Sequence, residues 1–192
     1  MRMIGSKPKI LALALSLVLS LGVGLLATGC NSSEGSGPAA ANPHGLGVAN
    51  CDALLTSAEA AEILGQPILS ITPRDTGNIL NCAYHGGESG QLLPPEIVIT
   101  AFTTDGFAAR FNTTVPAYYD ALDARTAATL KTPQSGIGTK AMWMNGPAKI
   151  AMYKGDVYAD VFCRPHGTPI RDTSAEAQTG AKAAALRVAA KL

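Results

Sequence analysis

The chain has few charged residues, few aromatic residues and no cluster of basic side chains. Of its 192 residues, 15% are charged and 5% are aromatic, and 15 Lys and Arg nearly balance 14 Asp and Glu. Nucleic-acid binding requires a basic stripe or patch, so we expect no nucleic-acid partner. A content of 47% hydrophobic residues is too high for a wholly disordered chain. The composition therefore indicates a folded protein that does not act on nucleic acid.

The motifs of common catalytic and cofactor-binding classes are missing or out of context. Residues 87–91 fail the last position of a G-x-S-x-G nucleophile elbow. Gly136-x-Gly138-x-x-Ala141 fits a loose dinucleotide pattern, but that motif must follow a strand and open a helix. Here it leads into a predicted strand, so we interpret it as a turn. We expect no cofactor.

Two C-x-x-H spacings are the only local hint of a metal site. They are Cys82 with His85 and Cys163 with His166, which together have the ligands of a tetrahedral site. We favour ordinary surface histidines, because Cys82 is a candidate for a disulfide and Pro165 restricts the second pair. We therefore predict no metal.

The first 29 residues have the layout of a bacterial secretion signal. Arg2, Lys7 and Lys9 precede an apolar run over 10–26, and small residues lead to Cys30. The segment resembles a lipobox, in which the Cys is lipidated and becomes the new N-terminus, although such boxes usually have Leu where Ala27 stands. An uncleaved anchor or ordinary signal cleavage are the alternatives. We predict a protein held by lipidated Cys30 on the extracytoplasmic face of the cell membrane.

The mature chain divides into a tether and one domain. Residues 30–50 are dominated by Gly, Ser, Pro, Asn and Ala, which predicts a flexible tether with a reach of about 25 Å. Residues 51–192 are enough for a single domain. All ten aromatic residues lie between Tyr84 and Phe162, so we expect the core there.

Residue patterns in the domain predict the order α-βββ-α-βββ-α. The predicted strands are 68–72, 80–85, 97–102, 139–144, 148–153 and 157–163, and the predicted helices are 56–64, 107–122 with a break at Pro116, and one that begins near 173. Capping boxes at 56–59 and 173–176 mark two of the helix starts. Strands joined by hairpins favour a single α+β domain, with a mainly antiparallel sheet and flanking helices.

Three cysteines remain if Cys30 is lipidated, and they allow three pairings. An oxidising compartment favours one bridge. We favour Cys51 with Cys82, which would tie the N-terminal helix to the first β unit and stabilise by about 3 kcal/mol. Cys163 then falls on the apolar side of its strand as a buried thiol, with a reactive thiol as the alternative.

Trp143 stands between two methionines in a predicted strand. Met-rich surfaces adapt to irregular partners, so Trp143 together with Tyr119 is a candidate ligand surface. The alternative is that Trp143 belongs to the core.

Several short motifs resemble the actinobacterial lipoproteins of the DUF3558 type. They are Cys51-Asp52-Ala53-Leu54-Leu55-Thr56 with Glu59, Leu64 and Gly65, then Asn81-Cys82-x-Tyr84, Gly136-x-Gly138-x-x-Ala141 and Lys154-Gly155-Asp156-Val157. Cys163 and Ala27 depart from the usual pattern. The resemblance implies a lipid-anchored α+β domain and, because that family has no assigned activity, it implies no mechanism.

The sequence favours a non-enzymatic module that binds a cell-envelope partner or small ligand. An envelope enzyme with a dispersed site, collecting His85, His166 and Asp160 in one cleft, is the first alternative. A purely structural envelope protein is the second.

Overall fold

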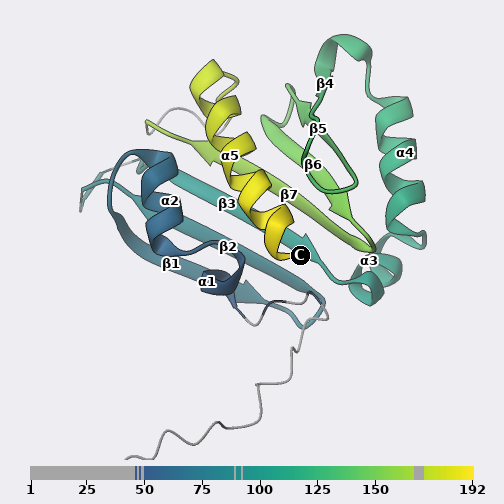
Figure 1. Ribbon diagram of the computed structural model, residues 1–192, viewed down its shortest axis with the longest axis horizontal. Coiled ribbons are helices and arrows are strands. Elements are labelled where there is room, and N and C mark those ends of the chain that lie inside the picture. The colour runs from purple at the N-terminus through teal and green to yellow at the C-terminus, as the bar shows by residue number, and fades with distance from the viewer. Residues whose placement is uncertain (1–45, 47, 49, 89, 92, 167–170) are drawn as a thin grey trace, which may run out of the picture. The chain divides into compact units, whose positions relative to one another are not determined.

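A seven-stranded antiparallel sheet organises the chain (Figure 1). The computed structural model describes residues 46, 48, 50–88, 90–91, 93–166 and 171–192. The strands are β1 (Ile68–Asp75), β2 (Ile79–Gly86), β3 (Glu96–Phe102), β4 (Lys131–Pro133), β5 (Lys140–Met144), β6 (Lys149–Lys154) and β7 (Val157–Arg164). The helices are α1 (Cys51–Leu54), α2 (Ser57–Leu64), α3 (Thr104–Phe111), α4 (Val115–Arg125) and α5 (Ala175–Lys191), with a short 3-10 turn η1 (Ala128–Leu130). The predicted α+β class is confirmed.

The strand order is β1-β2-β3-β7-β6-β5-β4. Each of the two predicted β runs forms a meander, and the two meanders join through β3 and β7, where Ile97 lies opposite Cys163 and Ala101 opposite Ala159. The turn expected at the glycine pair lies between β4 and β5, where Gly136 and Gly138 have positive φ values of 79° and 55°. The sequence missed β4 and α1, which have only three and four residues.

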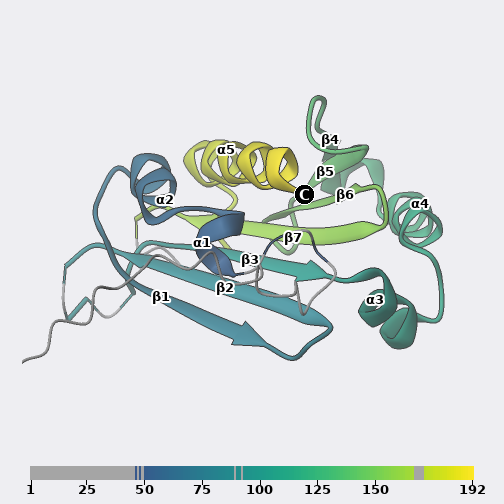
Figure 2. The ribbon, with the colours of Figure 1, turned by 60° about the horizontal axis from the view of Figure 1, so that its bottom comes forward.

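Helices α1, α2 and α5 cover one face of the sheet, which we call the first face (Figure 2). Its core contains alternate residues of the strands, which point to this face, and the buried side of α5. The buried residues of α5 are small: Ala177, Gly180, Ala181, Ala184, Ala185, Val188 and Ala189. Small side chains allow a helix to approach a sheet closely. A Cβ on Gly180 would lie 2.5 Å from the Sγ of Cys163, so the packing leaves no room there.

Helices α3 and α4 cover only part of the opposite, second face. Their aromatic and aliphatic side chains pack with those of β3, β5, β6 and β7: Phe102, Phe107, Val115, Tyr119, Leu122, Met142, Met144, Ala151, Tyr153 and Tyr158. In β2 and β3, buried residues alternate with half-buried ones, as expected for strands with one covered face. Among the described residues, α3 reaches only the end of β2 and β3 at Ile79 and Phe102, and no helix packs over the rest of the β1–β3 part of the second face.

Local sequence signals explain most helix ends. The predicted capping box is present, because Thr56 accepts from the N–H of Glu59 and the Glu59 carboxylate accepts from the N–H of Thr56. Gly65 then ends α2 in the left-handed conformation. The capping box predicted at 173–176 is wrong. The N-cap is Ser174, whose hydroxyl accepts from the N–H of Ala177. The third helical residue is therefore Ala177, which has no side-chain acceptor for the N–H of Ser174.

The predicted helical stretch 107–122 does consist of two pieces, but Pro116 is not the break. The chain turns at Asn112, which has a φ of 50°, and restarts at the N-cap Thr114. Pro116 lies in the first turn of α4, where a missing N–H costs nothing.

The packed core begins before the expected domain boundary. Leu46 and Val48 are 1% and 5% exposed and belong to the first-face core. These two apolar residues of the predicted tether therefore join the domain. The expectations for residues 1–29 and for Cys30 lie outside the described residues. Within the described part of the chain, no helix is both long enough and apolar enough to cross a bilayer.

Candidate functional site

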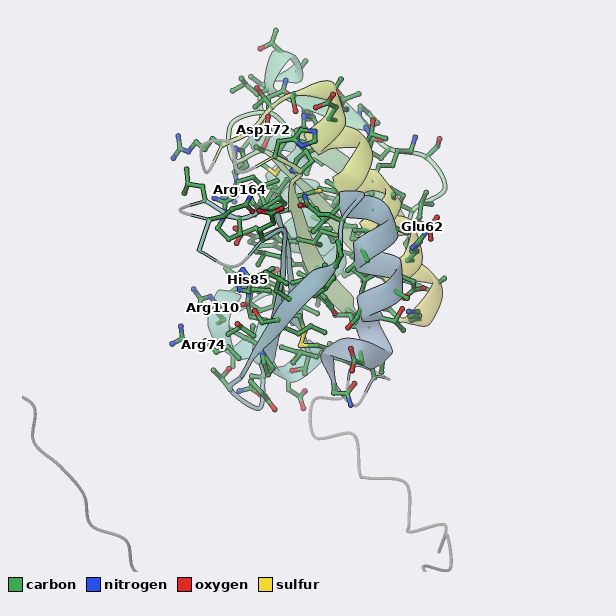
Figure 3. The ribbon with its side chains drawn as sticks, turned by 90° about the vertical axis from the view of Figure 1, so that its left-hand side faces the viewer. Glu62, Arg74, His85, Arg110, Arg164 and Asp172 are labelled. Atoms are coloured by element: carbon green, nitrogen blue, oxygen red, sulfur yellow. A yellow bond between two sulfur atoms is a disulfide. The ribbon has the colours of Figure 1, made fainter. Side chains whose placement is uncertain are left out.

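The uncovered part of the second face is the candidate site, and we call it the open face. Cross-strand register places its residues in rows that run across β1, β2, β3 and β7. The rows contain Ser70, His85, Glu96 and Arg164; Thr72, Ala83, Val98 and Phe162; and Arg74, Asn81, Thr100 and Asp160. Figure 3 shows Arg164, His85, Arg110 and Arg74 on the side of the sheet opposite α2 and α5.

The first row is a charge cluster centred on Glu96. Its Oε2 atom lies 3.3 Å from Nη2 of Arg164 and 3.5 Å from Nδ1 of His85. Arg164 also donates to the carbonyl of Pro94 at 3.1 Å and is 5% exposed, and no described residue accepts from its Nε. The charges at this end of the open face are therefore paired within the protein, because the Glu96 carboxylate lies beside both the Arg164 guanidinium and the His85 imidazole.

The second row is apolar. Ala83, Val98 and Phe162 are half-buried neighbours on β2, β3 and β7, and Phe162 also packs against the first-face core. Thr72 of β1 lies beside Ala83 and is exposed. The row gives the open face a flat apolar strip without a covering element among the described residues.

The third row is polar and internally bonded on β2, β3 and β7. The amide of Asn81 donates to the hydroxyl of Thr100 at 2.7 Å. Asp160 accepts from Lys149 at 2.5 Å and from the hydroxyl of Tyr158 at 2.9 Å. Burial and the Asp160 charge raise the pKa of Tyr158, so this hydroxyl stays a donor. On β1 the row ends at Arg74.

A hollow of about 390 Å³ opens at the Arg74 end of the open face. It is lined by Arg74, Thr76, Ile79, Asn81 and Arg110, so two arginines border one hollow, and none of its described lining residues is a carboxylate. Figure 3 shows the two arginines projecting from neighbouring positions at this edge. The arrangement suits an anion, because each guanidinium offers several donors in a fixed fork.

Close packing of α3 against the β1–β2 turn brings the two arginines together. A Cβ on Gly106 would lie 2.4 Å from the carbonyl oxygen of Asn78, so glycine is needed for this approach. The backbone N–H of Thr103 donates to the same carbonyl at 3.1 Å, and the Thr103 hydroxyl caps α3 through Gly106. Arg110, on the last turn of α3, is thereby held beside the hairpin that carries Arg74.

The two arginines of the hollow have no ion-pair partner among the described residues, whereas half of the twelve Lys and Arg side chains in the domain have one. The paired side chains are Lys131, Lys140, Lys149, Arg164, Arg187 and Lys191. Arg110 only lies over the ring of Phe111, at 5.6 Å. Two unpaired like charges that face one hollow repel each other, which favours an anion between them.

The ligand surface predicted around Trp143 and Tyr119 is wrong. Trp143 is 1% exposed in the first-face core and Tyr119 is 4% exposed in the second-face core. The sheet lies between them. Trp143 also satisfies its indole N–H within the protein, by donating to Asn145 at 2.6 Å.

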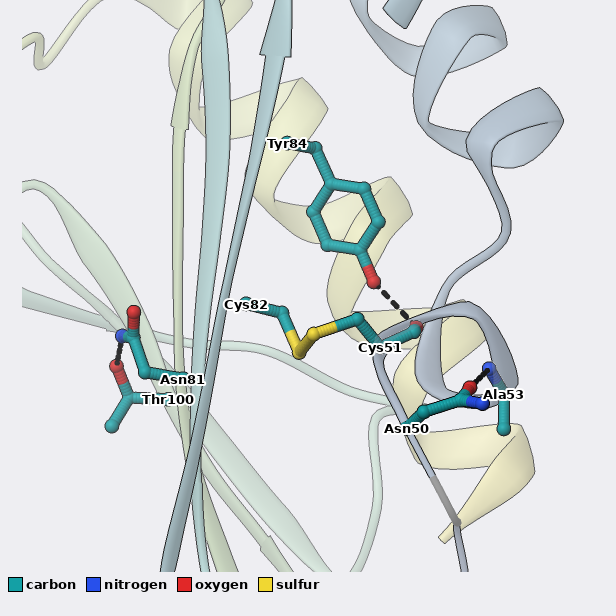
Figure 4. Close-up of a disulfide and its surroundings, with 7 residues drawn as sticks. All are labelled: Asn50, Cys51, Ala53, Asn81, Cys82, Tyr84 and Thr100. Atoms are coloured by element: carbon teal, nitrogen blue, oxygen red, sulfur yellow. Dashed lines mark hydrogen bonds between the residues drawn. A yellow bond between two sulfur atoms is a disulfide. The ribbon is translucent and has the colours of Figure 1, made fainter. Parts of the chain in front are cut away.

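The predicted disulfide is present and is structural (Figure 4). It joins Cys51 of α1 to Cys82 of β2, and the buried hydroxyl of Tyr84 donates to the Cys51 carbonyl at 2.6 Å. Figure 4 shows Cys82 and Tyr84 on one side of β2, with Asn81 and Thr100 on the other. The bridge therefore belongs to the first face, and the motif residues that suggested a family resemblance hold the fold.

The residues considered for an enzyme or a metal do not gather. His85 lies on β2 beside Glu96, and Asp160 pairs with Lys149. His166 lies 3.3 Å from Glu176 at a hollow of about 450 Å³ between α2 and α5. Cys82 is oxidised, and no described group of three His, Cys, Asp or Glu residues has the geometry of a metal site.

Cys163 is a free thiol in the core, as predicted. It is 0% exposed, and burial raises its pKa to about 12. A thiol that stays protonated and inaccessible is a poor nucleophile.

Comparisons with family models, curated proteins and solved structures give no significant match. The function must therefore be argued from the site itself. The open face and its arginine hollow are what sequence reasoning missed, because Arg74 and Arg110 are far apart in the chain and meet only in the fold.

Proposed function

We propose that this protein is a lipid-anchored, extracytoplasmic binding module that recognises an acidic ligand of the cell envelope on its open face. The observation that carries the proposal is the pair of unpaired arginines, Arg74 and Arg110, at the edge of a sheet surface that no described helix covers. Positive charge without an internal partner is complementary to an acidic ligand.

The positive charge of the two arginines contrasts with the net charge of the rest of the protein. Without its 29-residue leader, the protein has two more acidic than basic residues, so the hollow is a positive site on a weakly negative protein. General electrostatic attraction cannot account for acidic ligands here. Recognition depends instead on the placement of the two arginines.

A disulfide and the leader sequence support the proposed extracytoplasmic location and lipid anchor. The Cys51–Cys82 bridge suits an oxidising compartment outside the cytoplasm. The apolar run before Cys30 and the resemblance to DUF3558-type lipoproteins favour a lipid anchor. In cells supplied with labelled palmitate, we expect label in the wild type and an unlabelled precursor for Cys30→Ser. Equal labelling of both forms would remove the anchor from the proposal.

Site-specific photo-crosslinking tests the binding surface. We would place p-benzoylphenylalanine at Thr72, which is exposed on the open face, or at Lys182, which is exposed on α5 over the first face. Illumination of cells should give a discrete adduct from position 72 and none from position 182. Adducts from position 182 alone, or from neither position, would contradict binding through the open face.

A further inference from the structure

We propose that the hollow between Arg74 and Arg110 binds a phosphate group. This inference rests on the proposed function and names the acidic chemistry that the open face recognises. The hollow joins a side chain of β1 to a side chain of α3, with Thr76, Ile79 and Asn81 completing its lining.

Charge and donors favour an oxyanion in this place. Arg74 and Arg110 have no ion-pair partner among the described residues, and none of the described residues that line the hollow is a carboxylate. An oxyanion between the guanidinium groups replaces their mutual repulsion by two charge-assisted sets of hydrogen bonds. The Asn81 amide gives only one of its two hydrogens to Thr100, so another polar group is available at the wall.

The number of donors favours phosphate over carboxylate. A carboxylate presents one edge of two oxygens, which one guanidinium fork can saturate. A terminal phosphate presents three oxygens and up to two negative charges, so two forks from different directions can each take an edge. Two arginines that approach from separate elements therefore fit the tetrahedral group better than the planar one.

The size of the hollow allows more than a bare ion. A volume of about 390 Å³ lies in the range of small-molecule sites and leaves room for a glycerol- or sugar-sized body beside the phosphate. Half-buried Ile79 gives this body an apolar wall. A phosphate monoester of the envelope matches all of these features. The diester headgroup of a phospholipid, with two terminal oxygens and one charge, matches the positive charge and the size of the hollow but offers fewer acceptors.

Calorimetric titration of the full chain, purified in a neutral detergent and a phosphate-free buffer, tests the inference. The probes are glycerol 3-phosphate, a monoester, and glycerophosphoglycerol, the diester headgroup of phosphatidylglycerol without its acyl chains. Sodium acetate is the carboxylate control. We expect a phosphate probe to bind more tightly than acetate. The tighter phosphate probe identifies the source as a free ester or a lipid headgroup.

Two variants locate the binding. Arg74→Gln and Arg110→Gln should each weaken the affinity for the better phosphate probe by about tenfold or more, because each removes charged hydrogen bonds. Lys182→Gln, which removes an exposed cation of α5, should leave the affinity unchanged. All three should keep the wild-type melting temperature, because the substituted side chains are exposed.

Several outcomes would overturn the phosphate site. They are no heat of binding with either phosphate probe, acetate binding as tight as phosphate binding, or phosphate binding that survives both arginine substitutions. If a crosslink from Thr72 persists in that case, the binding function of the open face stands and only its phosphate chemistry is rejected. If that crosslink is also missing, both proposals fail.

Discussion

The two faces of the sheet differ in what their side chains do. On the first face, three helices, a disulfide and alternate residues of the strands form a closed apolar core with Cys163 and Trp143 inside. On the open face, a half-buried apolar strip lies between polar rows, and two arginines have no ion-pair partner among the described residues. In the proposed function, the first face supplies stability and the open face binds the ligand.

This division gives different expectations for substitutions on the two sides. Changes on the first face should lower stability, and ligand binding should follow only through loss of fold. Changes on the open face should alter binding at constant stability. The predictions below test that contrast, beginning with the largest effect.

Loss of the disulfide should be the most damaging change. Cys51 and Cys82 are 31 positions apart, so their bridge stabilises the fold by about 3 to 4 kcal/mol in the chain-entropy model. The double variant Cys51→Ala/Cys82→Ala should lose that amount of unfolding free energy in urea titrations. A loss below about 1 kcal/mol would mean that the first face does not depend on the bridge.

A matched pair of valines separates the two faces directly. Val161 is 0% exposed in the first-face core, whereas Val98 is half-buried on the open face. Val161→Thr buries a hydroxyl and should cost about 2 kcal/mol. Val98→Thr should cost under about 0.5 kcal/mol, because its hydroxyl reaches water. Equal costs in chemical denaturation would show that something covers the open face.

The contact between Gly180 and Cys163 predicts that Gly180→Ala destabilises the wild type but stabilises a variant that lacks the Cys163 sulfur. In the wild type, Gly180→Ala places a methyl group 2.5 Å from the Cys163 sulfur and should destabilise by about 1 to 2 kcal/mol. In a Cys163→Ala background the clash is gone, and alanine should stabilise α5 by up to about 1 kcal/mol. Thermal melts of the four proteins measure the cycle. A destabilising effect in both backgrounds would contradict the described packing.

The ion pair between α2 and α5 predicts a smaller, pH-dependent effect. Glu59 accepts from Lys191 at 2.5 Å, and mainly this contact, helped by bonds from Thr56, lowers the Glu59 pKa from 4.5 to about 2. A lowered folded-state pKa stabilises the fold above about pH 4.5, and this contribution is lost as the pH falls towards 2.

The matching variant is Glu59→Gln, which can still accept from the Thr56 N–H. It should be less stable than the wild type by about 1 kcal/mol at pH 7, and the difference should disappear between pH 4.5 and 2. Melting curves across this pH range provide the measurement. A difference that is independent of pH would remove the Glu59 charge from the explanation.

Sequence reasoning succeeded where the signal is local. The capping box at 56–59 was predicted correctly, because both of its hydrogen bonds join residues of one helical turn. The Cys51–Cys82 pairing was also predicted, because the compartment and the element order limited the choice. The sequence prediction failed at the start of α5. The helix begins one residue later than expected, at the N-cap Ser174, and this shift removes Glu176 from the position that a capping box requires.

Functional residues were harder to predict, since they depend on tertiary contacts. Trp143 and its two neighbouring methionines are residue types that often contact ligands, but the position of Trp143 in β5 points its side chain into the core. Arg74 and Arg110 look like ordinary surface cations in the sequence. They line one hollow only because α3 packs on the β1–β2 turn at Gly106, which no local pattern reveals.

The contrast between the faces is tested most directly by measuring melting temperature and glycerol 3-phosphate affinity on the same samples of Val161→Thr and Arg110→Gln. We predict that Val161→Thr lowers the melting temperature and keeps the affinity of its folded fraction. Arg110→Gln should keep the melting temperature and lose about tenfold or more in affinity. An Arg110→Gln protein that melts early, or one that binds like the wild type, would contradict the division between a structural face and a binding face.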